Sequence, residues 1–205
     1  MGFQTLDGIE VPSLTADQMR AVDDIAIENS KPALLQMMEY AGASLAEFAI
    51  EQWPRAARVG PVVVLAGTGH NGGGGICAAY HLLSQGVPVR LCLSDSEAKL
   101  KGTTAVQFQR YRNAGGITES PITIWEPAPM LIIDALLGYG VTGTARGPVL
   151  TLIERANAIA KGHGSALLSL DLPSGVNPDN LCNSCTGSIR ADKTLTLASP
   201  KPGLG

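Results

Sequence analysis

Residues 61–75, PVVVLAGTGHNGGGG, join a continuous apolar run to a glycine-rich segment. The unbroken run from Pro61 to Ala66 is typical of a parallel strand that is buried on both faces. The glycines that follow predict a sharp turn into a helix from about Gly73 to Gln85. A strand that leads directly into a helix is the repeating unit of α/β domains. This stretch therefore predicts an α/β fold with a parallel sheet covered by helices on both faces.

The alternation of strands and helices extends along the chain in both directions. Residues 15–18, TADQ, form a capping box, which predicts the start of a helix that runs to about Asn29. Pro32 is typical of the first residue of a second helix, which we expect to end near Trp53. Both helices precede the first strong strand, so they are expected to be additions to the sheet. Further strands are expected at residues 88–93, 122–125, 130–134, 166–170 and 194–197, and further helices at about 97–113 and 148–161.

The composition excludes several classes of protein. The chain has 205 residues, of which 45% are hydrophobic, and this suits one domain with a sizeable core. The formal net charge is −3 and aromatic residues make up 4%, so a nucleic-acid-binding protein is not expected. No apolar stretch is long enough to span a membrane, and the first ten residues do not resemble a secretory signal. The four cysteines are scattered, so we expect no disulfide framework and a cytoplasmic protein.

The first of three polar loops that follow apolar strands carries six glycines between residues 67 and 75. In open α/β sheets, ligands bind at the carboxyl ends of the strands, so position alone nominates these loops. Glycines let the backbone approach a ligand closely, and the N–H groups that open the helix favour a phosphate. The segment lacks the Gly-Lys-Ser/Thr of a Walker motif and matches the dinucleotide fingerprint only loosely. A tight strand-to-helix turn without a ligand stays open as the alternative.

Carboxylates end two other apolar strands. Asp134 precedes a second glycine-rich loop that leads to Pro148, and Asp171 precedes a Pro-Ser-Gly turn that contains Ser174. Asp134 could instead cap a turn, and Arg146 could either anchor a phosphate or pair locally. The serine does not lie in a Gly-x-Ser-x-Gly elbow, so a serine hydrolase is not expected.

Asn71, Asp134 and Ser174 offer side-chain oxygens from the ends of three strands. Hard cations prefer oxygen ligands, so this set is a candidate cation site. Asp134 and Asp171 at the same edge of the sheet also permit general acid–base catalysis, provided that the pKa of one of them is raised. These loops are therefore the candidate functional site.

Other polar residues are weaker candidates. Cys182 and Cys185 have the spacing of zinc ligands, but no second pair of ligands with suitable spacing accompanies them, so a surface loop is the preferred interpretation. His81 is expected to be structural or exposed. The solvated face of one helix is expected to carry Lys99, Lys101, Arg110 and Arg112.

Four motifs that occur in order carry a resemblance to a known family. They are AGTGHNGGGG from residue 66, DALLGYGVTGTARGPV from residue 134, LSLDLPSGVN from residue 168 and ADKTLTLASPKPGL from residue 191. Together with the opening helices they resemble the YjeF N-terminal domain family, the NAD(P)H-hydrate epimerases, over about residues 13–205. The resemblance implies a single domain over residues 1–205, a three-layer α/β/α Rossmann-like sandwich whose central sheet is mostly parallel. It also implies a homodimer that epimerises hydrated NADH or NADPH at nicotinamide C6, alongside a separate dehydratase that is specific for one epimer.

The resemblance also assigns roles to individual residues. It makes Asn71, Asp134 and Ser174 the ligands of a potassium ion. It makes Asp171 a substrate contact, and by position and family analogy Asp171 is the candidate acid or base. The resemblance implies that the hydrated nucleotide contacts two loops, at His70, Asn71, Gly72, Gly73 and Gly74 and at Gly138, Tyr139, Gly140, Val141, Thr142, Gly143 and Thr144.

The chain departs from the family pattern Asn-Asn-Gly-Gly-Asp-Gly at two positions. His70 replaces the first Asn, and Gly74 replaces the Asp. The sequence also stops soon after Leu204, where family members usually continue, so a trimmed C-terminus or a degenerate member is expected. The epimerase is therefore weighed against a non-catalytic domain of this family that binds a nucleotide or a protein or RNA partner. Some other nucleotide-binding α/β enzyme is a third alternative.

Overall fold

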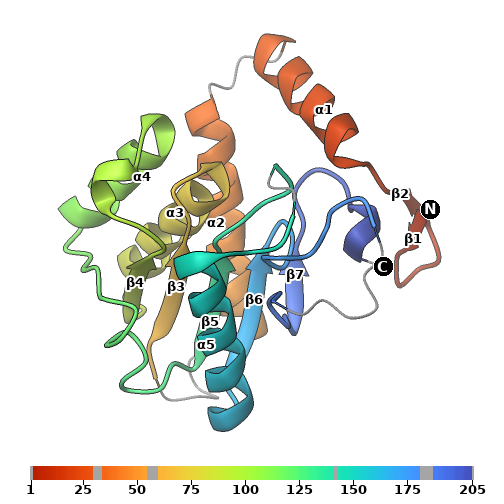
Figure 1. The fold of residues 1–205 in the computed structure, drawn as a ribbon. Helices are drawn as coiled ribbons and strands as arrows, with labels where there is room; N and C mark the ends of the chain where they lie inside the picture. Colours follow the sequence, from red (N-terminus) through yellow and green to blue (C-terminus); the bar gives the residue numbers. More distant parts are fainter. Residues whose placement is uncertain (1, 30–33, 55–59, 141–142, 181–186, 205) are drawn as a thin grey trace.

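A five-stranded parallel sheet is the centre of the computed structural model, which describes residues 2–29, 34–54, 60–140, 143–180 and 187–204 (Figure 1). The strand order is β4-β3-β5-β6-β7, and all four neighbouring pairs are parallel. Parallel neighbours require crossover connections, and one helix lies between β3 and β4, one between β4 and β5, and one between β5 and β6. The strands are β3 (Val62–Ala66), β4 (Val89–Leu93), β5 (Leu131–Ala135), β6 (Ala166–Leu170) and β7 (Lys193–Leu195).

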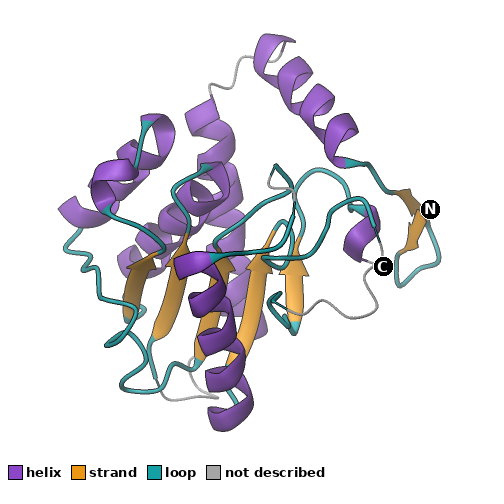
Figure 2. Ribbon diagram, in the orientation of Figure 1, coloured by secondary structure: helices purple, strands orange, loops and turns teal. Residues whose placement is uncertain are grey.

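Helices cover both faces of the sheet, as Figure 2 shows. The helices are α1 (Ala16–Asn29), α2 (Leu34–Gln52), α3 (His70–Ser84), α4 (Gly102–Asn113) and α5 (Gly147–His163). Val62 and Val64 of β3 point into the hydrophobic core beneath α2 and α3. Val63 and Leu65 point the other way, into a second core that includes residues of α5. Because successive strand residues face opposite sides, a strand between two helical layers must be apolar at every position.

Most of the expected elements are confirmed. The strands at 88–93, 130–134 and 166–170 lie within one residue of their expected bounds. The capping box is present, because the Thr15 N–H donates to Gln18 Oε1 at 2.9 Å and the Gln18 N–H donates to Thr15 Oγ1 at 3.3 Å. Pro32 lies outside the described residues.

Four expectations were wrong in their bounds or type. Helix α3 begins at His70 rather than Gly73, so most of the glycine-rich segment is helical. The expected helix at 97–113 is a short 3-10 turn (Glu97–Lys99) followed by α4, which begins at Gly102. Residues 122–125 form a turn instead of a strand. The last strand, expected at 194–197, begins one residue earlier and ends at Leu195.

The N-terminal segment lies beside the carboxyl ends of the strands instead of packing on a face of the sheet (Figure 1). It opens with the antiparallel hairpin of β1 (Gly2–Gln4) and β2 (Glu10–Pro12). The Leu14 N–H donates to Pro200 O at 2.9 Å, and the Ala16 N–H donates to Asp179 Oδ1 at 2.7 Å. These two bonds tether α1 to the loops that follow β6 and β7. No helix among the described residues is both long and apolar enough to cross a membrane.

Candidate functional site

The loops that follow β3 and β5 approach each other more closely than side chains would allow. The Gly67 N–H donates to Ala135 O at 3.0 Å. A Cβ atom on Gly67 would lie 2.0 Å from Leu136 O, and one on Gly72 would lie 1.9 Å from Gly67 O. These two glycines are therefore required by the packing of backbone on backbone, whereas the sequence analysis explained the glycines by the approach of a ligand and kept a tight turn as the alternative.

Asp134 is the buried centre of the site. Its Oδ1 accepts hydrogen bonds from Ser174 Oγ at 2.6 Å and from the Leu136 N–H at 3.2 Å. Its Oδ2 accepts from Ser169 Oγ at 2.8 Å and from the Ser174 N–H at 2.8 Å. Burial raises the pKa of this carboxyl, and the hydrogen bonds from Ser174, Ser169 and Leu136 oppose the rise. Asp134 thus joins the ends of β5 and β6 and the turn after β6.

Asn71 and Ser174 meet next to Asp134, through the backbone of Leu137. Asn71 lies in the first turn of α3, and its Nδ2 donates to Leu137 O at 2.9 Å and to Leu170 O at 3.4 Å. The Leu137 N–H donates to Ser174 Oγ at 2.9 Å. The structure therefore brings together the three side chains that were nominated as cation ligands.

The chemistry of this set fits a hard cation. Ser174 Oγ lies 2.6 Å from Asp134 Oδ1 and 3.4 Å from Leu137 O, and the side-chain amide of Asn71 contacts the carbonyl oxygens of Leu137 and Leu170. Asp134 is fully buried, yet its described hydrogen-bond donors are all neutral, and it is in none of the ion pairs found among the described residues. A buried charge without a charged partner is costly, and a bound cation would offset that cost.

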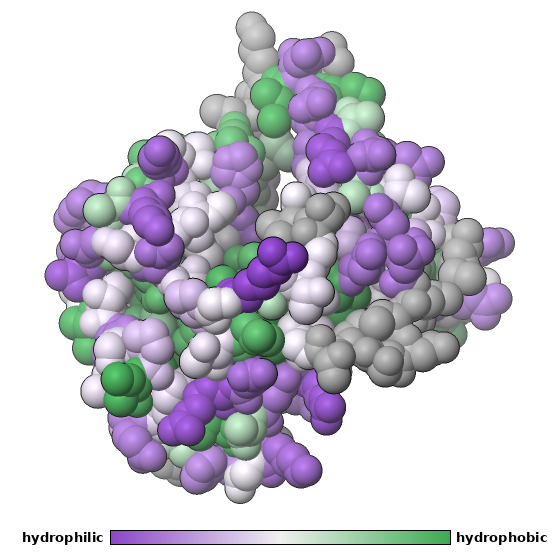
Figure 3. Space-filling model, viewed as in Figure 1, coloured by the Kyte–Doolittle hydropathy of each residue, from purple (hydrophilic) through white to green (hydrophobic). Residues whose placement is uncertain are grey.

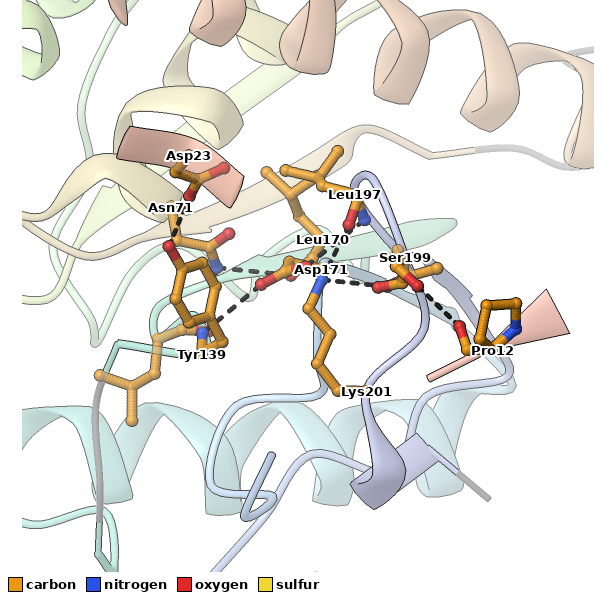
Figure 4. Close-up of polar contacts among 11 residues, drawn as sticks. Pro12, Asp23, Asn71, Tyr139, Leu170, Asp171, Leu197, Ser199 and Lys201 are labelled. Carbon is orange, nitrogen blue, oxygen red and sulfur yellow. Dashed lines mark hydrogen bonds and ion pairs between the residues drawn. The ribbon is translucent and has the colours of Figure 1, made fainter. Parts of the chain in front are cut away.

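Asp171 follows β6 and holds a second buried carboxylate (Figure 4). Its backbone has φ of 68°, a conformation that residues other than glycine adopt infrequently. Lys201, which is also fully buried, forms an ion pair with Asp171 Oδ1. The Tyr139 N–H donates to Asp171 Oδ2 at 3.4 Å. Asp171 therefore contacts both the second glycine-rich loop and the segment after β7.

Helix α1 reaches the site through Asp23. The hydroxyl of Tyr139 donates to Asp23 Oδ2, so the glycine-rich loop after β5 is bonded to α1 (Figure 4). Burial and the hydrogen bond to Asp23 raise the pKa of the Tyr139 hydroxyl, which remains protonated at neutral pH. The Lys201 ammonium lies 5.8 Å from the centre of the Tyr139 ring. Helix α1 therefore contributes Asp23 to the candidate site.

The first turn of α3 points its N-terminal end towards this region. His70 is exposed at the start of the helix, and Gly69 caps it without a side-chain hydrogen bond. The first backbone N–H groups of an α-helix lack helical partners and carry partial positive charge, which suits a phosphate. Gly72, Gly73 and Gly74 follow as buried helical residues.

The second glycine-rich loop, which follows β5, is only partly described. Gly138 and Tyr139 lie beside Asn71 and Asp171, whereas Gly140, Gly143 and Thr144 are exposed further along the loop. Val141, Thr142, Cys182 and Cys185 lie outside the described residues.

Sequence reasoning missed three polar residues that complete the site: Ser169, Asp23 and Lys201. Ser169 is the only hydroxyl in the apolar strand that ends at Asp171, which was an available signal. Lys201 stands between Pro200 and Pro202, an unusual setting that was also visible. Nothing local marks Asp23, because its partner is 116 residues away.

Comparison with known proteins identifies the family. A family model described as the YjeF-related protein N-terminus matches residues 34–203. The NAD(P)H-hydrate epimerase of Dehalogenimonas lykanthroporepellens is 38% identical over 98% of this chain and 80% of its own length. The NAD(P)H-hydrate epimerase of Rhodopirellula baltica is 34% identical over 95% of this chain and 78% of its own length. The bifunctional NAD(P)H-hydrate repair enzyme Nnr of Escherichia coli is 30% identical over 92% of this chain but only 35% of its own length.

A solved structure agrees with the fold. The crystal structure of the yeast protein ynu0, YNL200c, superposes with a TM-score of 0.84 at 23% identity, covering 95% of this chain and 83% of the yeast chain. The matched family model spans the sheet, its helices and all three loops of the candidate site. The chain therefore belongs to the family of proteins related to the YjeF N-terminus.

Proposed function

We propose that this protein is an NAD(P)H-hydrate epimerase, an isomerase that interconverts the two epimers of hydrated NADH or NADPH. The observation that carries the proposal is the similarity to proteins of that name over nearly the whole chain. The site supports it, because two carboxylates, a helix N-terminus and a glycine-rich loop lie at one edge of the sheet. The diphosphate would bind at the first N–H groups of α3, as phosphates do at helix N-termini.

The reaction inverts a carbon that carries a hydroxyl next to the ring nitrogen. Departure of the hydroxyl as water takes up a proton, and addition of water to the opposite face releases one. The proton for the departing hydroxyl can come from solvent, and a carboxylate held next to this carbon can accept the proton that the added water releases. Asp171 is our candidate, since the carboxylate is fixed from two sides and lies beside the loop that contains Tyr139. Asp134 is less suitable, because it is fully buried and is our candidate ligand for the cation.

A coupled assay tests the activity. The purified protein is mixed with a dehydratase specific for the S epimer and with NADHX enriched in the R epimer, and recovery of NADH absorbance is followed. The epimerase should raise the rate of recovery in proportion to its concentration. Recovery no faster than with the dehydratase alone would contradict the proposal. A nucleotide-binding domain without catalysis would then be supported if ADP-ribose still bound.

Potassium is the cation that we propose for Asn71, Asp134 and Ser174. When bound, it would neutralise the buried carboxylate and fix the ends of three loops, while the protein's own residues carry out proton transfer. A ligand that binds only the folded state raises the temperature of unfolding. The midpoint of thermal unfolding should therefore rise with potassium at constant ionic strength. Ser174→Ala should weaken this response, and Ser84→Ala, an exposed position at the other end of α3 from Asn71, should leave it intact. An equal response to potassium and a large organic cation would contradict the assignment.

We also propose that the protein forms a homodimer and acts with a dehydratase. The name of two relatives, bifunctional NAD(P)H-hydrate repair enzyme, supports the second of these proposals, since a dehydratase would be the other activity of such a chain. Exposed apolar side chains on α1 and α2, including Val22, Ile25 and Tyr40, favour a second copy as partner. On the face seen in Figure 3, hydrophobic residues gather in several small groups instead of one broad patch. The molar mass in solution tests the dimer. The expected cytoplasmic location stays a prediction.

A further inference from the structure

Lys201 is buried completely, which is rare for lysine. Three acceptors surround its ammonium group: Asp171 Oδ1, Leu197 O at 2.9 Å and Thr196 Oγ1 at 3.3 Å. An ammonium group has three N–H donors, so this environment satisfies each of them. The surroundings of Lys201 therefore suit a charged ammonium group, whose only ion-pair partner among the described residues is Asp171.

The two oxygens of Asp171 have different environments (Figure 4). Oδ1 faces Lys201 and also accepts from the Leu197 N–H at 3.4 Å. For Oδ2, the one hydrogen bond found among the described residues comes from the Tyr139 N–H, and it is long, at 3.4 Å. A carboxylate oxygen accepts more than one hydrogen bond, so Oδ2 keeps capacity for a further partner. It lies on the side of the loop expected to contact the nucleotide.

We propose that Lys201 is a positioning residue for epimerisation: it holds Asp171 through Oδ1 so that Oδ2 is presented to the substrate. The inference rests on the proposed function and extends it to a residue to which that function assigns no role. The left-handed backbone at Asp171 sets the direction of its side chain, and the ion pair fixes the rotation of the carboxylate. Because catalytic groups must be held within a fraction of an ångström of the productive geometry, loss of Lys201 should slow the reaction more than it weakens binding.

A purely structural role is the alternative, since Lys201 also joins the end of β6 to the segment after β7. Removing one partner of a buried ion pair destabilises a protein strongly, so loss of activity alone would not separate the two roles. The distinction lies in whether Lys201 acts through Asp171. If Lys201 acts through Asp171, then removing Lys201 should not lower kcat further in a protein whose Asp171 has already been replaced.

The experiment compares the wild type with Lys201→Met, Asp171→Asn and the double variant. The kcat and KM of each protein are measured in the coupled assay, and ADP-ribose binding is measured by calorimetry below the onset of unfolding. Lys201→Met should lower kcat by about 10²-fold, a large part of the effect of a general acid or base, with KM and the ADP-ribose affinity within about threefold of wild type. In the Asp171→Asn background the same change should lower kcat by less than about twofold. Lys99→Met, an exposed lysine on the 3-10 turn, is the control and should behave as the wild type.

Two outcomes would overturn the inference while leaving the proposed function intact. One is a Lys201→Met protein with near wild-type kcat, and the other is losses that multiply in the double variant. If Lys201→Met does not fold, Lys201→Gln keeps hydrogen-bond donors without the charge. Its kcat should still fall by at least about tenfold at unchanged KM, and a wild-type kcat would overturn the inference. A wild-type protein without turnover would instead contradict the proposed function itself, and the inference with it.

Discussion

Two carboxylates form ion pairs in different regions of the molecule. Asp171 lies in the loop that follows β6, and Glu39 lies on α2, between helices. Glu39 of α2 is 28% exposed and accepts hydrogen bonds from both Nη atoms of Arg110 and from Gln107 of α4. Cys77 and His81 of α3 also contact its oxygens, at 3.3 and 2.9 Å. Asp171 is almost fully buried, and only one of its oxygens is strongly engaged.

The difference separates a structural carboxylate from a candidate catalytic one. Side chains of α3 and α4 contact both carboxylate oxygens of Glu39. The charge of Glu39 therefore holds α2, α3 and α4 together. Asp171 keeps an oxygen with spare capacity at the edge of the sheet where ligands bind. Substitution of Glu39 should therefore change stability and spare turnover, whereas substitution of Asp171 should lower turnover.

The largest effect is expected at Asp171. Asp171→Asn keeps the size of the side chain and removes its ability to exchange a proton, so kcat should fall by about 10²–10⁴-fold. The affinity for ADP-ribose should change little, because this ligand lacks the nicotinamide ring. Steady-state kinetics and calorimetry measure the two quantities. A variant that retained more than about a tenth of the wild-type kcat would assign the proton transfer to another residue.

The same substitution at Asp134 should act on folding. Oδ1 accepts from the Leu136 N–H and Oδ2 accepts from the Ser174 N–H, so an asparagine in either orientation would leave one backbone donor without its acceptor. An unsatisfied buried donor costs about 1–3 kcal/mol, and urea unfolding should show this loss in Asp134→Asn. Asp95→Asn, at an exposed position, should change the unfolding free energy by less than about 0.5 kcal/mol. Equal stability of the two variants would show that these bonds contribute nothing.

The sequence predicted the sheet well because burial on both faces leaves one readable pattern, the continuous apolar run. The same rule failed at residues 122–125, where Ile124 and Trp125 are buried in a turn beside α5. An apolar run indicates that its residues are buried. It does not by itself indicate whether their backbone is extended. The helix expected at 97–113 is interrupted at Leu100 and Lys101, which have extended backbones between the 3-10 turn and α4.

Within the site, the sequence revealed residues that follow strands and missed partners brought in from afar. Asp134 and Asp171 each end an apolar run, and that position alone nominated them. Lys201 reaches Asp171 across 30 residues. Arg110 was expected on a solvated helix face, and this was wrong, because it forms an ion pair with Glu39, 71 residues away. Pairing of this kind depends on how helices pack, which no local pattern encodes.

A third prediction uses the pH dependence of stability at Glu39. The Arg110 guanidinium, followed by the other donors, lowers the pKa of this carboxyl from 4.5 to about 2. A lowered pKa in the folded state contributes stability that is present above the ordinary pKa and is lost as the pH falls towards 2. Allowing for partial exposure, the contribution is about 1–2 kcal/mol.

Glu39→Gln should therefore be less stable than the wild type at pH 7, and the gap should narrow between pH 4.5 and 2. Urea unfolding at several pH values measures this difference, which cancels the contributions of other carboxylates. The kcat of Glu39→Gln at pH 7 should match the wild type. A constant gap across this range would mean that the charge of Glu39 does not stabilise the fold, and a large fall in kcat would remove the distinction from Asp171.

The smallest effect is expected in α3, which connects the two regions: its first turn carries Asn71, and its later turns present Cys77 and His81 to Glu39. A Cβ on Gly75 would lie 2.4 Å from the Cβ of Ala135 in β5, which has no flexible end that could move away.

On Gly74, a Cβ would meet only the terminal Cδ2 of Leu170, at 2.8 Å, and a small rotation of that side chain relieves the contact. Alanine favours a helix over glycine by about 1 kcal/mol, whereas overpacking a core costs about 1–3 kcal/mol. Gly74→Ala should thus be near neutral in unfolding free energy, and Gly75→Ala should be destabilised by about 1 kcal/mol. If Gly75→Ala proved the more stable of the two, the close packing of α3 on the sheet would not require these glycines. A role in backbone contact with the nucleotide would then be their main reason, and loss of ADP-ribose affinity in both variants would reveal it.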